Sequence, residues 1–470
     1  MSKPKPIDLW TPIVATEKQH NNFRWILERG SEAGREVISS WAEGFHDRDG
    51  KFVREFQTTF DSAFWELYLF ACFKELKLSP RMDHHAPDFM LKIGAASVAA
   101  EATVAKEAEG HRPEWDKYDL RKAHDIADLA QRVRYTTVRL ASRFVSKVAE
   151  YRKKYSALPH IKGRPFVLCI APFDQPFTFD LAQQAMRRVL YRADTPIFQR
   201  DPKTGEAIVF GVSEVDRVTK DAGVDVPLGV FCDASFSEVS AVIFSTTATW
   251  CKVRALSADS EEGTIFRAER YNAHGTIPLL TVAKKPQYRE TLLDGLILCL
   301  NPFASHPIDV EPFLNREIAL ESWHREAQTY VGAAPHEWLI RRFCLTANVV
   351  PEVTPAPKPP ARVYKEIKVP VWPNGELRPV PVVMWPAVDQ HMAHLDGWTV
   401  VVFRDAVDDA WEAMAIHAIV HTIPEFREKN NDDAIQTVMA INDYPSRDGA
   451  FEAIKKAIKA AKRSRRGRNR

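Results

Sequence analysis

The sequence lacks the features that mark several large protein classes. Its 470 residues contain no apolar run long enough to cross a membrane, and the N-terminus has no apolar core of signal-peptide length. It has neither a GxxxxGK[ST] nor a GxGxxG motif, so nothing supports a nucleotide-hydrolysing motor or a dinucleotide-dependent enzyme. A GxSxG nucleophile elbow is also missing. These absences predict a cytoplasmic protein that does not span a membrane.

Cysteine is scarce and irregularly spaced. The six cysteines stand singly in apolar stretches, and none forms a CxxC pair: Cys72, Cys169, Cys232, Cys251, Cys299 and Cys344. A zinc ribbon or a disulfide framework would need closer or more regular spacing. We therefore expect buried, reduced thiols.

The formal net charge is only +2, but it is unevenly distributed along the chain. From Lys455 to Arg470, nine of sixteen residues are Lys or Arg and none is acidic, which leaves the rest of the chain at −7 (+2 minus 9). Phe451, Ile454 and Ile458 precede this run at helical spacing and predict an amphipathic helix that leads into a disordered basic arm. Such arms bind phosphate backbones without sequence preference, although a solubilising tail is the other interpretation. The predicted nucleic-acid contacts are Lys462, Arg463, Arg465, Arg466 and Arg468.

With 45% hydrophobic and 27% charged residues, the chain is long enough and apolar enough for two or three domains. The clearest boundary is Pro351–Arg362, where five prolines in twelve residues are typical of a stiff, extended linker. We predict a helical N-terminal lead-in at 1–58, an α/β domain at 59–345, a Pro-rich linker at 346–362, a small C-terminal α/β domain at 363–450 and a basic tail at 451–470.

Four segments of the large domain have clear patterns. Thr59–Leu76 is apolar nearly all round and predicts a buried helix, and Asp125–Tyr155 predicts a long amphipathic helix. Pro87–Ala105 has the pattern of a β-hairpin, and the apolar run Pro165–Pro172 predicts a strand covered on both faces. Further strands are expected at Leu228–Cys232, Val239–Thr246, Lys252–Leu256 and Ile277–Val282.

The hairpin brings two acidic residues together. Gly94-Ala95 suits a two-residue type II′ turn, and this turn places Asp88 directly opposite Glu101. Opposed side chains share a sheet face and lie about 5 Å apart at Cβ, so the two carboxylates repel each other. A divalent cation between them would offset that repulsion, because Mg²⁺ prefers carboxylate oxygens. A one-residue bulge would instead put the acids on opposite faces, each solvated.

Two more ionisable residues have apolar surroundings. On the predicted long helix, Lys147 lies just beyond an apolar stripe, so it leans toward whatever the helix packs against, unless its ammonium extends to water. The stripe consists of Val133, Thr137, Leu140, Phe144, Val148 and Tyr151. Glu66, on the first helix, has apolar neighbours at helical spacing and needs a cation, hydrogen-bond donors or a raised pKa.

The order of these elements resembles the core of the PD-(D/E)XK nuclease superfamily. A buried helix with a glutamate is followed by Pro87-Asp88, by Glu101 on the next strand, and then by a helix and an apolar strand. Several segments also resemble an uncharacterised bacterial branch of that superfamily, and the resemblance covers roughly residues 59–310. They are FWELYLFACFKEL (Phe64–Leu76), APDF (Ala86–Phe89), EATVA (Glu101–Ala105), RLASRFVSK (Arg139–Lys147), LGVF (Leu228–Phe231) and LLDGLILCLNPFASHP (Leu292–Pro307).

One position departs from the family pattern. The family's third signature residue is a lysine two positions after the strand acid, and this chain has Thr103 there. Three interpretations are open: Lys147 reaches in from the helix, Lys106 takes the role, or the site is inactive. We favour Lys147 because it lies beside the packed stripe.

The resemblance implies an α/β fold with a mixed sheet flanked by helices and extended by further strands. It also implies a Mg²⁺- or Mn²⁺-dependent nuclease that hydrolyses phosphodiester bonds, in DNA in preference to RNA, in bacterial defence or repair. Asp88, Glu101 and Glu66 would be the metal ligands, and Lys147 would position or stabilise the attacking hydroxide. The alternative is a nuclease-fold protein that has lost cleavage and serves as a nucleic-acid-binding or scaffold component. The sequence leaves open whether a second copy or a partner protein takes part.

Overall fold

A computed structural model describes the chain at residues 7–107, 129–174, 181–200, 207–220, 223–258, 264–275 and 278–346, and further along at 376, 378–379, 387–395, 398–405, 410–418 and 435–468. Contacts within the chain divide these residues into two units, one ending at Thr346 and the other beginning at Glu376. The predicted Pro-rich linker lies outside the described residues, except for Thr346, which ends a strand.

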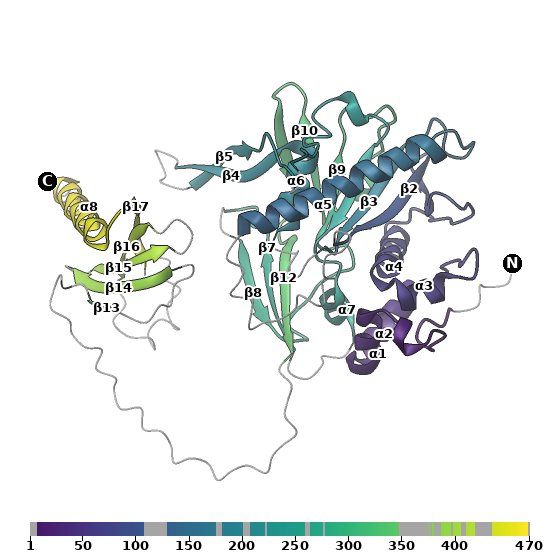
Figure 1. The fold of residues 1–470 in the computed structure, drawn as a ribbon, viewed down its shortest axis with the longest axis horizontal. Helices are drawn as coiled ribbons and strands as arrows, with labels where there is room; N and C mark the ends of the chain where they lie inside the picture. The colour runs from purple at the N-terminus through teal and green to yellow at the C-terminus, as the bar shows by residue number, and fades with distance from the viewer. Residues whose placement is uncertain are drawn as a thin grey trace, which may run out of the picture. The chain divides into compact units, whose positions relative to one another are not determined.

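The first unit is built on a mixed sheet of seven strands in the order β1-β2-β3-β6-β9-β10-β11 (Figure 1). The β2-β3, β3-β6 and β9-β10 pairs are parallel, and the other neighbours are antiparallel. The strands are β1 (Phe89–Ile93), β2 (Ala96–Ala105), β3 (Phe166–Pro172), β6 (Ala241–Ser245), β9 (Leu296–Leu300), β10 (Ile318–His324) and β11 (Thr329–Ala333). The predicted mixed α/β core is therefore confirmed, and β3 is buried along its whole length, as its apolar run predicts.

Helices cover both faces of this sheet. The long α5 (Leu129–Glu150) crosses one face (Figure 1), and its predicted stripe, from Val133 to Tyr151, is buried there together with α6 (Ala182–Tyr191). The apolar helix α4 (Phe60–Glu75) packs against the other face, where the indole of Trp65 donates a hydrogen bond to the carbonyl of Cys169 on β3. The preceding helices share the α4 core: α1 (Asn21–Arg29), α2 (Glu32–Trp41) and α3 (Phe52–Thr58).

The β1-β2 hairpin has the predicted register. Ile93 pairs with Ala96 and Phe89 with Ala100, so no bulge interrupts the ladder. Gly94 has a φ of +57°, which the type II′ turn requires at this position and which glycine adopts without strain. Asp88 directly precedes β1, outside the printed ladder, and its side chain accepts a hydrogen bond from the backbone N–H of Ala102, the residue after Glu101 on β2.

Two smaller sheets extend the first unit. One has the order β12-β7-β8 and the other is the β4-β5 hairpin. Their strands are β4 (Ala193–Arg200), β5 (Ala207–Glu214), β7 (Thr264–Arg270), β8 (Leu279–Ala283) and β12 (Leu339–Thr346). Two strand predictions are wrong. Lys252–Leu256 lies in the helix α7 (Trp250–Leu256), and Leu228–Cys232 is irregular backbone that hydrogen-bonds to the end of α6. Both runs are only five residues long, and periodicity cannot distinguish a strand from other buried conformations at that length.

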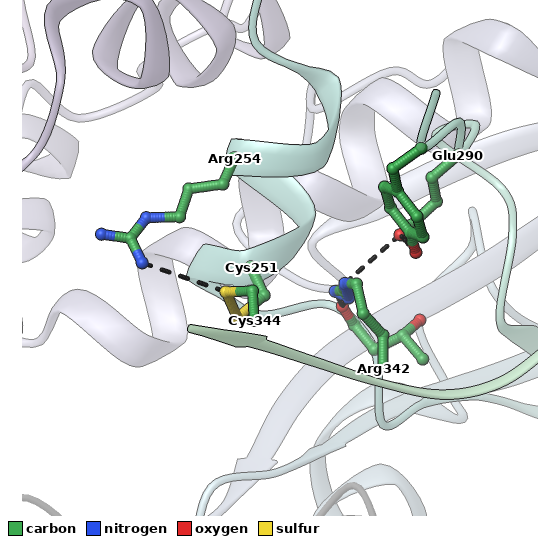
Figure 2. Close-up of a disulfide and its surroundings, with 7 residues drawn as sticks. Cys251, Arg254, Glu290, Arg342 and Cys344 are labelled. Atoms are coloured by element: carbon green, nitrogen blue, oxygen red, sulfur yellow. Dashed lines mark hydrogen bonds and ion pairs between the residues drawn. A yellow bond between two sulfur atoms is a disulfide. The ribbon is translucent and has the colours of Figure 1, made fainter. Parts of the chain in front are cut away.

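The prediction of six reduced cysteines is also wrong. Cys251 on α7 and Cys344 on β12 form a disulfide, although 93 residues separate them in the sequence (Figure 2). Single cysteines give no sign of such a pairing, because the fold alone brings the two elements together. The other four are free, and Cys72, Cys169 and Cys299 among them are buried.

The second unit consists of an antiparallel sheet in the order β13-β14-β15-β16-β17 and the helix α8 (Arg447–Arg468). Phe451, Ile454 and Ile458 of α8 pack on the sheet, and the helix continues to Arg468 where a disordered arm was expected. The strands are β13 (Arg378–Pro379), β14 (Ala387–Leu395), β15 (Trp398–Asp405), β16 (Trp411–Ala418) and β17 (Ile435–Tyr444). Among the described helices of the whole chain, none is both long and apolar enough to cross a membrane.

Candidate active site

The centre of the site is a contact between Glu101 on β2 and Lys147 on α5. The Lys147 Nζ atom donates a hydrogen bond of 2.7 Å to Glu101 Oε1, and both side chains are largely buried. Lys147 extends from the edge of the packed stripe of α5, and Glu101 lies on the sheet face beneath that helix. Lys147 also lies 3.3 Å from Glu150, one turn further along α5. The helix thus delivers an ammonium group to the acid that the hairpin presents.

Asp88, the residue just before β1, joins this pair. Its Oδ2 atom accepts a hydrogen bond of 2.8 Å from the backbone N–H of Ala102. The side chain of Asp88 is 24% exposed, so the carboxyl group reaches the surface of the site. Burial and the negative charge of Glu101 together raise the pKa of Asp88 to about 7, against the lowering effects of the Ala102 N–H and of Lys147.

The surroundings of Lys147 favour its charged form. Burial by itself would lower the pKa of this lysine, but the charge and hydrogen bond of Glu101, with the charge of Glu150, outweigh burial and raise the pKa. Lys147 therefore stays an ammonium group at neutral pH. In that form it can stabilise negative charge, and it cannot act as a general base.

Glu66 lies near the acids but does not complete a ready-made ligand set. Burial raises the pKa of Glu66 well above its ordinary value, and the charge of Asp88 is the next largest cause. Both effects favour the neutral form of the carboxyl group. Among the described residues, no three His, Cys, Asp or Glu side chains are grouped so that they could hold a metal ion. The structure thus brings Asp88, Glu101 and Lys147 together, with Glu66 close enough to interact by charge.

The other lysine that the sequence offers does not reach the acids. Lys106 follows the end of β2 and makes no ion pair with Asp88 or Glu101, all three of which the structure describes. At the family's lysine position, Thr103 is buried, and its hydroxyl accepts a hydrogen bond from Arg143 of α5.

Sequence analysis missed three further residues of the site. Arg48, between α2 and α3, lies with Nη2 3.9 Å from Asp88 Oδ1 and donates to the backbone carbonyls of His84 and Pro87. Tyr155 lies close enough that Glu101 and Glu150, after burial, raise its pKa. Arg143 contacts Thr103. Tyr155 and Arg143 follow the helical spacing of Lys147, which is a signal that could have found them, whereas nothing near Arg48 in the sequence points to Asp88.

The predicted nucleic-acid contacts at the end of the chain are only partly described. Lys462, Arg463, Arg465, Arg466 and Arg468 fall within the bounds of α8, but their side chains lie outside the described residues. Their role stays a prediction.

A second cluster of charged side chains is buried in the first unit. Glu290 is fully buried, with Lys252 Nζ 2.5 Å from Oε1 and Arg342 Nε 3.2 Å from Oε2. Burial would raise the pKa of Glu290, but the charges of Arg342 and Lys252 outweigh burial and lower it. Figure 2 shows Arg342 facing Glu290 close to the disulfide. The two cations come from α7 and β12, the same elements that the disulfide joins, so this cluster fastens structural elements to each other.

No family model, curated protein or solved structure matches this chain.

Proposed function

We propose that this protein is a metal-dependent nuclease with a PD-(D/E)XK-like core, in which Asp88, Glu101 and Lys147 carry out phosphodiester hydrolysis. The observation that supports the proposal most is the 2.7 Å contact between Lys147 and Glu101, with Asp88, the residue before β1, hydrogen-bonded to the N–H of Ala102. Two acids and one ammonium group from three separate elements meet on one sheet face. This combination suits a reaction in which negative charge develops on a phosphate group.

The acids suit Mg²⁺ or Mn²⁺ as a cofactor. Carboxylate oxygens are the donors that these ions prefer, and Mg²⁺ usually keeps several waters, so two protein ligands are a common number. Burial and the charge of Glu101 raise the pKa of Asp88 to about 7, and a divalent cation bound between the two acids would favour their ionised forms. Bound there, the ion would polarise the scissile phosphate and lower the pKa of a water molecule.

Each residue of the site has a separate task in this proposal. Asp88 and Glu101 hold the ion, and the Ala102 N–H fixes one Asp88 oxygen so that the carboxyl group keeps its orientation. Lys147, an ammonium group at neutral pH, stabilises the charge that develops on the phosphate. Glu66 serves as a further ligand only after it loses its proton, because its pKa is raised. DNA is the preferred substrate in this proposal, with the basic end of α8 as a further contact to the phosphate backbone.

Two observations favour a second candidate, a nuclease-fold protein that binds nucleic acid without cleaving it. Thr103 stands where the family has lysine, and the described residues contain no preformed group of three metal ligands. Such a protein would bind DNA, and Mg²⁺ would change neither its stability nor the DNA.

The decisive experiment compares cleavage of a labelled DNA duplex with and without Mg²⁺ or Mn²⁺, with an RNA duplex assayed in parallel. Asp88→Asn, Glu101→Gln and Lys147→Met should each reduce the rate by about a hundredfold or more, which is typical for the loss of one group that stabilises transition-state charge. Lys154→Met is the matched control, because Lys154 follows α5 and pairs with Glu150 at 2.8 Å but not with Glu101. Undiminished cleavage by the first three variants would rule out the assignment, and the absence of any cleavage by the wild type would favour the non-catalytic candidate.

A further inference from the structure

Helix α5 and strand β2 are joined by a row of side-chain contacts. Along α5, Lys147, Arg143 and Arg139 follow one another at intervals of one helical turn. Lys147 donates to Glu101, and Arg143 donates from Nε to the hydroxyl of Thr103. Arg139 donates to the backbone carbonyls of Lys106 and Glu107, just past the end of β2. Three cations therefore lie side by side along the strand that carries the acid of the site.

Lys147 and Arg143 differ in whether a carboxylate lies at ion-pair distance from them. Lys147 is matched by two carboxylates, Glu101 at 2.7 Å and Glu150 at 3.3 Å. Arg143 has no carboxylate at ion-pair distance within the part of the chain that the structure describes. It is half-buried, and arginine keeps its proton at any physiological pH. Arg143 is thus a fixed cation beside the site whose charge no described carboxylate neutralises directly.

Its hydrogen bonding leaves the guanidinium group able to take an anion. Only the Nε–H is used, by the buried hydroxyl of Thr103, and the described residues offer no acceptor to either terminal amino group. A guanidinium held at Nε presents a planar pair of donors, which matches the oxygens of a phosphate group.

We propose that Arg143 is a phosphate-binding residue that contacts the nucleic-acid backbone next to the scissile bond and that Thr103 positions it. The proposal rests on the proposed function for the identity of the anion as a phosphodiester. Thr103 then holds the second cation of the site in place, and the lysine of the family pattern is replaced by a pair of cations on α5. Lys147 keeps its role beside the acids and the reacting phosphate, and Arg143 binds a phosphate of the backbone next to it.

Equilibrium binding without cleavage tests the proposal. A short fluorescein-labelled DNA duplex is titrated with the full chain in EDTA, and fluorescence anisotropy is recorded over a series of salt concentrations. Arg143→Ala should weaken binding at least about tenfold, the effect of losing hydrogen bonds to a charged group. The slope of log affinity against log salt should fall by about one, because one phosphate contact is lost.

Three further variants separate the contact from a change in folding. Arg143→Lys keeps the charge but not the planar pair of donors, so it should restore the salt slope and only part of the affinity. Thr103→Val removes the acceptor at nearly constant volume and should weaken binding with the slope unchanged. Arg152→Gln is the control, because Arg152 lies beyond α5, pairs with Glu238 and is 53% exposed.

The outcomes distinguish this inference from the proposed function. The phosphate-binding role would be overturned if Arg143→Ala had the same salt slope and affinity as Arg152→Gln, whatever the cleavage assay shows. Binding that depends on Arg143 in a protein that never cleaves would support it and would reject the hydrolytic proposal. A wild type that binds no DNA at any salt concentration would overturn the inference as well.

Discussion

The first unit contains two groups of buried or partly buried charges with opposite electrostatic character. Around Glu290, two cations within 3.2 Å outweigh burial and lower the carboxyl pKa. Around Asp88, burial and the charge of Glu101 outweigh the Ala102 N–H, Lys147 and Arg48, and the pKa rises to about 7. The Glu290 cluster pairs its acid with two close cations and serves the fold, whereas at Asp88 burial and a second carboxylate disfavour the ionised form. Shifted pKa values of the second kind are the ones that gather at functional sites.

The largest loss of stability is expected when the acid of the Glu290 cluster is removed. Glu290→Gln should lower the free energy of unfolding by about 3–5 kcal/mol, because it leaves Lys252 and Arg342 buried without their counter-charge. Denaturant unfolding followed by circular dichroism measures the change. Glu238→Gln is the control, since its partner Arg152 is mostly exposed and such surface pairs contribute about 0–1 kcal/mol. Equal effects of the two variants would show that the buried cluster is not structural.

The disulfide should contribute the next largest effect, in the same region. Cys251→Ser or Cys344→Ser should lower the free energy of unfolding by about 2–4 kcal/mol, because the long loop between the cysteines is no longer closed in the unfolded chain. A dithiol reductant should destabilise the wild type by a similar amount and leave both variants unchanged. If the reductant acts equally on all three proteins, the link does not stabilise the fold.

In the Asp88 site, removing the acid should have the opposite sign. The pKa of Asp88 is about 7 in the folded chain against an ordinary value of 3.8, so the folded state binds more protons between these values and its stability falls as pH rises through that window. Asp88→Asn, which cannot ionise, should therefore gain about 1–2 kcal/mol over the wild type above pH 7 and little below pH 4. Thermal unfolding as a function of pH measures the difference, and a destabilised variant at pH 8 would contradict the raised pKa of Asp88.

The same experiment with added Mg²⁺ sharpens the comparison. The ion should raise the unfolding temperature of the wild type increasingly as pH rises through 7, because Asp88 binds it only after losing its proton. The two variants should respond differently to Mg²⁺. Asp88→Asn should lose the rise in unfolding temperature, and Glu290→Gln should keep it despite its lower stability.

The smallest effect is expected at Glu66. Burial and the charge of Asp88 raise its pKa well above the ordinary value and so favour the neutral carboxyl group, which Glu66→Gln imitates. The free energy of unfolding should change by less than about 1 kcal/mol, because the amide has nearly the size of the carboxyl group and carries no charge. The Mg²⁺ response decides its role: a response that Glu66→Gln abolishes would make Glu66 a ligand, and an unchanged one would leave it as a neighbour of the site.

Local patterns were enough for the elements that carry the site. Gly94-Ala95 determines the hairpin turn, the turn determines the register, and the register brings Asp88, just before β1, beside Glu101 and Ala102 on β2. The apolar stripe of α5 likewise determines which side Lys147 leans toward. These features are set by residues close together in the sequence, so the strand period and the helix period predict them.

Contacts between distant segments were decided by the tertiary structure alone. Arg48 reaches Asp88, Cys251 bonds to Cys344, and Glu290 joins cations from α7 and β12. The sequence around each of these residues does not predict its partner, because the two meet only when separate helices and strands pack around a shared core. The same holds for the short run Lys252–Leu256, whose five residues fit a buried strand or a helix equally well until the neighbouring sheet fixes the choice.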